Sequence, residues 1–175
     1  MKKGYIIIIF CFMIACGIIA SRMAGGTASG NAGQNSNSAS EAATEKKVSK
    51  MTTAELFDAI MSSPQYSSNT RDYLDAHEAE HKQLLKNKET TLKYIFKQFL
   101  NGQKGEGENG LKGALMVVLL NELAPESVID LAAPPQEYFD AWMDMAKQET
   151  EGHDDAWIKS NYPAAHILFQ MLAEQ

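Results

Sequence analysis

A glutamate and two histidines fall at the spacing of a known zinc-hydrolase motif. Residues 77–81 read His-Glu-Ala-Glu-His, a formal H-E-x-x-H. On a helix, this spacing places two imidazoles one turn apart so that both can bind Zn²⁺, while the glutamate activates a metal-bound water. The pattern therefore predicts, as one alternative, a small zinc-dependent hydrolase with His77 and His81 as metal ligands and Glu78 as the catalytic residue.

The same two histidines also fit a structural role. Charged Glu80 and Lys82 flank His81, although a helix that presents a buried zinc ion favours uncharged neighbours. On a helical wheel, His77 and His81 fall inside the one apolar arc by which their helix, which can break near His77, packs against the domain. That arc consists of Tyr73, Leu74, Leu84 and Leu85. We therefore favour histidines that pack in the domain interior or at its rim, and we expect no metal and no cofactor.

Other residues that could do chemistry have simpler explanations. His153-Asp154-Asp155 resembles the His-Asp pair of metal phosphohydrolases, but aspartates ahead of a short helix are more often caps. His166 is expected on the solvated face of the last helix. The glycine-rich segment 102–110 lacks the Gly-Lys-Ser/Thr of a phosphate-binding loop, so we expect a mobile surface loop there.

The N-terminus has the layout of an export signal. Two lysines precede an uncharged, apolar run of 18 residues (4–21), just long enough to span a bilayer as a helix. The lysines favour a cytoplasmic N-terminus, which places the rest of the chain outside. Three fates are open: an uncleaved signal-anchor over residues 1–21, cleavage near residues 20–24, or a lipoprotein with lipid attached to Cys16. The last follows from residues 13–16, which resemble a bacterial lipobox.

A linker and one acidic domain follow. Residues 22–50 are rich in Gly, Ser and Asn without apolar periodicity, so we expect a disordered linker with a span of about 30 Å. Residues 51–175 suffice for one domain with its own core. Without Lys2, Lys3 and Arg22, the chain keeps 13 of its 16 basic residues against 22 acidic ones, a net charge of −9. Such a charge argues against nucleic-acid binding and against direct docking on anionic lipids.

The domain is expected to be all-α. Apolar residues recur with helical periodicity, and no stretch alternates long enough to predict a strand. The segment 111–123 is apolar on every side and is therefore expected at the centre of the fold. Thr52 with Glu55 forms a capping-box pattern, while Pro135 and Pro163 open later helices. These signals predict an irregular bundle or a helical-repeat-like stack of six to seven short helices behind the membrane segment and linker.

Four phrases of the domain carry a family resemblance. They are Ser63-Pro64-Gln65-Tyr66-Ser67-Ser68-Asn69 with Tyr73-Leu74, Thr91-Leu92-Lys93-Tyr94-Ile95-Phe96, Gly110-Leu111-Lys112-Gly113 and Gln136-Glu137-Tyr138-Phe139. The chain resembles a family of uncharacterised exported helical domains of low-GC Gram-positive bacteria, found in small lipoproteins and as outer domains of β-lactam-sensor-type transducers. It departs from the pattern in its longer glycine loop and in having nothing like the transducer's membrane peptidase. The resemblance implies an exported helical fold and transfers no catalytic residue.

These features predict a domain on the extracytoplasmic side of the cell membrane, tethered there by the N-terminal segment. We expect it to act without catalysis, as a binding, accessory or sensing module. The expected partner is a protein or another component of the cell envelope, and no nucleic acid is expected.

Overall fold

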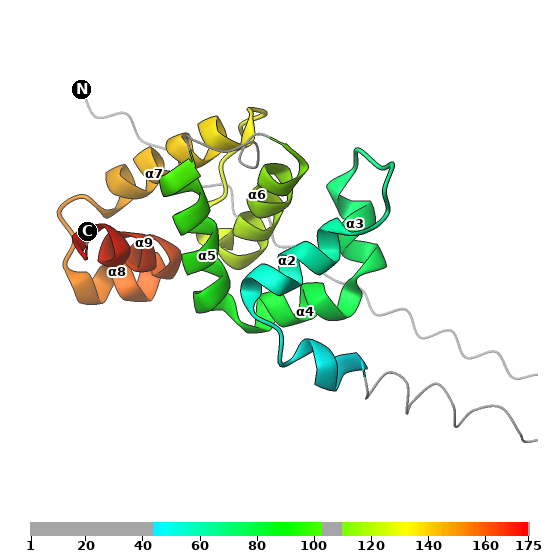
Figure 1. Ribbon diagram of the computed structural model, residues 1–175. Coiled ribbons are helices and arrows are strands. Elements are labelled where there is room, and N and C mark those ends of the chain that lie inside the picture. The colour runs from blue at the N-terminus through cyan, green and yellow to red at the C-terminus, as the bar shows by residue number, and fades with distance from the viewer. Residues whose placement is uncertain (1–43, 103–109, 175) are drawn as a thin grey trace, which may run out of the picture. The chain divides into compact units, whose positions relative to one another are not determined.

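The described part of the chain folds as a bundle of short helices (Figure 1). The computed structural model describes residues 44–102 and 110–174. After an N-terminal turn of helix at residues 44–48, the elements are α2 (Thr53–Met61), α3 (Thr70–Ala76), α4 (Glu78–Lys86), α5 (Lys88–Asn101), α6 (Leu111–Leu123), η2 (Pro125–Ser127), α7 (Pro135–Thr150), α8 (Asp155–Asn161) and α9 (Pro163–Ala173). Within these two ranges every element is helical and none is a strand, which confirms the predicted all-α class.

Local sequence signals set where the helices begin. Thr52 caps α2 through the predicted capping box, because its hydroxyl accepts from the Glu55 N–H and its own N–H donates to the Glu55 carboxylate at 2.7 Å. Asn69 caps α3 and Asp154 caps α8, each by accepting a backbone N–H with its side chain. Pro135 is the first residue of α7, a position whose backbone N–H has no hydrogen-bond acceptor within the helix, so proline's lack of an N–H costs nothing there. The helix starts predicted at Thr52, Asp154 and Pro135 are therefore confirmed.

Helix α6 lies at the centre of the bundle, as its all-round apolar sequence predicts. It packs against α3, α4, α5 and α7, and none of its residues is exposed. Its large buried side chains are Leu115, Met116, Leu119, Leu120 and Leu123. Figure 1 shows α8 and α9 at one end of the bundle and α3 with α4 at the other. Among the residues that the structure describes, no helix has the length and apolarity needed to cross a membrane.

An aromatic cluster joins α5 to α7. Phe96 stacks on Trp142 with ring centroids 5.4 Å apart, and Phe99 stacks on Phe139 at 4.7 Å. All four side chains are at most 1% exposed. Such aromatic pairs add to the stabilisation that burial of their area already provides. These stacked rings therefore hold α5 against α7 in the core.

Two features near the N-terminal end refine the expectation. The expected linker ends at residue 50, but residues 44–48 are helical and Val48 is only 3% exposed, so this segment packs on the domain instead.

The break expected near His77 is present, since the φ of −126° and ψ of 49° at His77 lie outside the helical region. His77 and His81 therefore do not share one helix, and the apolar arc drawn through both of them does not apply.

Candidate functional site

The connection between α2 and α3 presents the most exposed large hydrophobic side chain of the described residues. This connection, residues 62–69, reads Ser-Ser-Pro-Gln-Tyr-Ser-Ser-Asn, and Tyr66 at its tip is 97% exposed. We call it the Tyr66 loop. Tyrosine offers a large contact area at a low cost in conformational entropy, and serine and asparagine offer adaptable hydrogen bonds, a composition typical of protein-binding loops. The Tyr66 loop is therefore the candidate binding surface.

His77 holds the first end of the Tyr66 loop. Its Nε2 atom forms a hydrogen bond with the Oγ atom of Ser63 at 2.9 Å, across 14 positions of sequence. The His77 side chain is 17% exposed, and its Nδ1 lies 3.8 Å from a carboxylate oxygen of Glu80. His77 thus sits at the rim of the domain and connects the helix break to the Tyr66 loop.

Residues at the start of α3 hold the second end of the loop. The buried Tyr73 donates its hydroxyl proton to the Ser67 carbonyl at 3.0 Å. The Asn69 N–H donates to the Ser67 hydroxyl at 3.0 Å, and the Asp72 carboxylate accepts from both Ser67 and the Asn69 side-chain amide. Both ends of the loop are fixed to the domain, so the exposed Tyr66 is carried on a rigid base.

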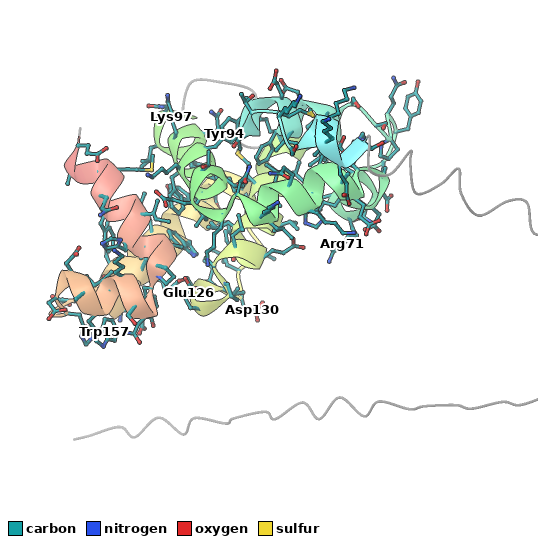
Figure 2. The ribbon with its side chains drawn as sticks, turned by 90° about the horizontal axis from the view of Figure 1, so that it is seen from below. Arg71, Tyr94, Lys97, Glu126, Asp130 and Trp157 are labelled. Carbon is teal, nitrogen blue, oxygen red and sulfur yellow. The ribbon has the colours of Figure 1, made fainter. Side chains whose placement is uncertain are left out.

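His81 holds α4 against α6. Its Nε2 donates to the Glu122 carboxylate at 2.6 Å, and the other oxygen of Glu122 accepts from Arg71 at 3.1 Å. His81 is 14% exposed and Glu122 is 26% exposed, so the pair is partly shielded from water. Arg71, His81 and Lys82 help to line a cleft of about 490 Å³ over the apolar side chains of Leu74 and Leu85. Figure 2 shows Arg71 pointing out of this end of the bundle.

The H-E-x-x-H residues are therefore arranged differently from a zinc motif on one helix. His77 lies in the break before α4, whereas His81 lies within α4. Their Nε2 atoms face separate partners, Ser63 and Glu122, which come from different elements. Among the described residues, no group of three or more His, Cys, Asp or Glu side chains is placed to hold a metal ion.

Glu78, the catalytic residue of the zinc alternative, faces solvent. Its side chain is 71% exposed and forms an ion pair with Lys82 at 2.6 Å. The hydrogen bond and the charge of Lys82 lower the pKa of Glu78, with a small further contribution from His81. A general base near neutral pH needs a pKa raised toward that pH, so the shift runs in the opposite direction.

The other residues singled out from the sequence have structural surroundings. Asp154 caps α8, as expected, and the exposed His153 stacks on Trp157 with centroids 3.5 Å apart. The expectation that His166 is solvated is wrong: it is 7% exposed, and its Nε2 donates to Asp155 at 3.0 Å. The structure brings His166 and Asp155 together because Pro163 opens α9 directly after α8. Cys16 and most of the segment 102–110 lie outside the described residues.

Sequence reasoning missed the contacts that give this site its form. The Ser63–His77 and His81–Glu122 pairs join residues that are 14 and 41 positions apart, and no local pattern encodes them. A signal for the loop did exist, because a proline, a tyrosine and four serines between two helices are typical of an exposed connection.

Chemically, the site offers an exposed aromatic ring, serine hydroxyls and a partly buried histidine–carboxylate pair. No protein-family model matches the chain, and no curated protein or solved structure matches it either.

Proposed function

We propose that the chain is a membrane-tethered, non-enzymatic binding module on the outer face of a bacterial cell. The N-terminal segment holds it at the membrane, and the Tyr66 loop contacts a protein of the cell envelope. One observation carries the binding role: Tyr66 is 97% exposed on a loop whose two ends are fixed by hydrogen bonds to α3 and to His77.

A fixed loop with an exposed tyrosine suits recognition of a partner. Binding residues are concentrated on loops that a rigid scaffold positions. Tyrosine is among the residues that most often dominate the binding energy of protein interfaces. The loop is held before binding, so association costs little conformational entropy. For the fold itself, an exposed ring of this size contributes nothing by burial.

The membrane tether rests on the sequence. Two lysines followed by 18 uncharged residues favour an external domain, and the resemblance to exported helical domains supports the same location. A reporter enzyme that works only in the cytoplasm should stay silent when fused after Gln175, and strong activity would refute this topology. Lipid incorporation that disappears in Cys16→Ser would identify the lipoprotein fate.

The zinc-hydrolase alternative receives less support from the geometry. It needs His77 and His81 on one helix face and a glutamate beside the metal. The two histidines instead lie on either side of a helix start, and Glu78 pairs with Lys82 in solvent. We therefore assign His77 and His81 the role of positioning the loop and the helices.

Photo-crosslinking in the producing cell tests the binding role. A photo-reactive phenylalanine derivative replaces Tyr66 in the full chain, and the matched control carries it at exposed Lys147 on α7. We expect a discrete adduct, dependent on light, from position 66 and none from position 147. Equal adducts from both positions would show nonspecific contact, and no adduct from position 66 would contradict the proposal.

A further inference from the structure

Charge is distributed unevenly over the described chain. Residues 44–102 contain nine basic and eight acidic side chains, whereas residues 110–174 contain three basic and eleven acidic ones. The net charge of these described residues, −7, therefore comes from the acidic C-terminal half. Figure 2 shows acidic Glu126 and Asp130 along the lower edge of the bundle, between Trp157 and Arg71.

Three lysines of the N-terminal half gather where the described chain begins. The N-terminal turn at residues 44–48 packs beside α4, and between them lies a groove of about 470 Å³. We call it the basic groove, because its charged lining is Lys46, Lys82 and Lys86 with the single carboxylate of Glu45. The three lysines are exposed, although Lys82 also pairs with Glu78.

The chain around the basic groove has a clear excess of positive charge. The two segments whose residues line it, 45–49 and 79–86, together contain four lysines and two glutamates. Val48 is 3% exposed, so its burial fixes the N-terminal turn against the domain and keeps the lysines of both segments near one another. An anionic surface is the complementary partner for such a patch.

We infer that the basic groove lies against the phosphate groups of anionic lipid headgroups, with the acidic half of the domain turned away from the membrane. This inference rests on the proposed membrane tether. The lysines lie at the end of the domain from which the chain leads back to the apolar run, so the tether brings this end nearest to the lipid. The repulsion expected from the net charge then applies to the acidic half alone.

The distance from the membrane suits such a contact. Residues 22–43, between the apolar run and the basic groove, number 22. The linker expected from this composition has an average span of about 25 Å. Attraction to an anionic surface acts within a Debye length of about 8 Å at physiological salt, which the domain reaches easily on such a tether.

Lysine acylation of the full chain in vesicles tests this inference. The protein is reconstituted in vesicles of phosphatidylcholine alone or of equal parts phosphatidylcholine and phosphatidylglycerol. A membrane-impermeant amine-acylating reagent is added, and mass spectrometry gives the acylation rate of each lysine. Lys147 on α7 and Lys159 on α8, both exposed, serve as internal controls.

We expect Lys46 and Lys86 to react about fivefold more slowly in the anionic vesicles, with the difference lost at high salt and with the controls unchanged. Glycerol phosphate added to neutral vesicles should not reproduce the protection, because the proposal requires a lipid surface. The double variant Lys46→Glu with Lys86→Glu should abolish the protection of Lys82, whereas Lys147→Glu with Lys159→Glu should leave it intact.

The outcomes separate this inference from the tether on which it rests. Protein that fails to float with either kind of vesicle would contradict the tether. Protein that floats with both, but whose lysines react at the same rate in both, would overturn the inference and leave the tether standing. Protection of the same lysines in neutral vesicles would indicate contact between protein copies and would also overturn it.

Discussion

The Nε2 atom of His77 lies 2.9 Å from the Oγ atom of Ser63, so the residue that separates α3 from α4 also holds one end of the Tyr66 loop. The pair is partly buried. His77, which belongs to the zinc-like sequence motif, therefore has a structural role as the partner of Ser63.

The first prediction concerns this pair. His77→Ala and Ser63→Ala should each lower the free energy of unfolding by about 1 kcal/mol, because each leaves a partly buried partner without its hydrogen bond. The double variant should cost less than the sum of the two single variants. Urea unfolding measures all three.

Glu78→Gln is the matched control for the first prediction. Its side chain is 71% exposed and its ion pair with Lys82 is surrounded by water, so the free energy of unfolding should stay unchanged. The role assigned to His77 would be contradicted if the losses in unfolding free energy of the two single variants simply added in the double variant. A large loss of unfolding free energy in Glu78→Gln would contradict it as well.

The second prediction concerns the central helix. Leu119 is 0% exposed in α6, a helix with no exposed residue, so Leu119→Asp places an isolated charge where no water can reach it. The loss should exceed about 4 kcal/mol and should unfold the domain. Circular dichroism would show the lost helix.

Leu172→Asp on α9 provides the comparison for Leu119→Asp. Leu172 is 36% exposed, so its substituted carboxylate can stay in water and the helical signal should persist. A folded Leu119→Asp protein of ordinary stability would show that α6 is not the centre of the core.

The helix signals were readable in the sequence because they are local. Thr52 and Glu55 are three residues apart and form their capping box without help from the rest of the fold. The uniform apolarity of 111–123 placed α6 at the centre because such a helix has no face to offer to water.

Contacts between distant residues were not readable. The polar face of α9 by itself predicts a solvated His166, whereas the preceding helix supplies Asp155 as a partner and covers the imidazole. Val48 is a single apolar residue in a polar stretch, and only its burial against the folded domain reveals that the linker ends before it. The exposure of Tyr66 likewise depends on how α2 and α3 are placed.

The third prediction concerns alkaline pH. Burial raises the pKa of Tyr162, and the negative charges of Glu149 and Glu126 and a hydrogen bond to Glu149 raise it further. A raised pKa in the folded state means that the neutral phenol contributes stability, fully present below the unfolded pKa of about 10 and lost as pH rises through the folded pKa.

Tyr162→Phe removes this titration. The variant should lose less stability than the wild type between about pH 9 and pH 11, when unfolding by urea is compared at both values. Identical pH slopes for the two proteins would show that Tyr162 does not titrate differently on folding.

The fourth prediction separates the two candidate functions. The purified full chain, dialysed against a weak chelator, should contain no stoichiometric zinc by elemental analysis, because the Nε2 atoms of His77 and His81 already have separate partners. One zinc per chain that disappears in His77→Ala would contradict this assignment and would favour the hydrolase.

The most direct test of the binding role is the adduct yield from the photo-reactive residue at position 66, measured in cells. Three chains that carry this residue are compared: one without a further change, one with Glu78→Gln and one with His77→Ala. We expect a full yield with Glu78→Gln, because that side chain faces water. A severalfold lower yield is expected with His77→Ala, because the Tyr66 loop loses one of its two fixed ends. An adduct that is absent from all three chains, or one that is abolished by Glu78→Gln and kept in His77→Ala, would contradict a partner-binding loop held by His77.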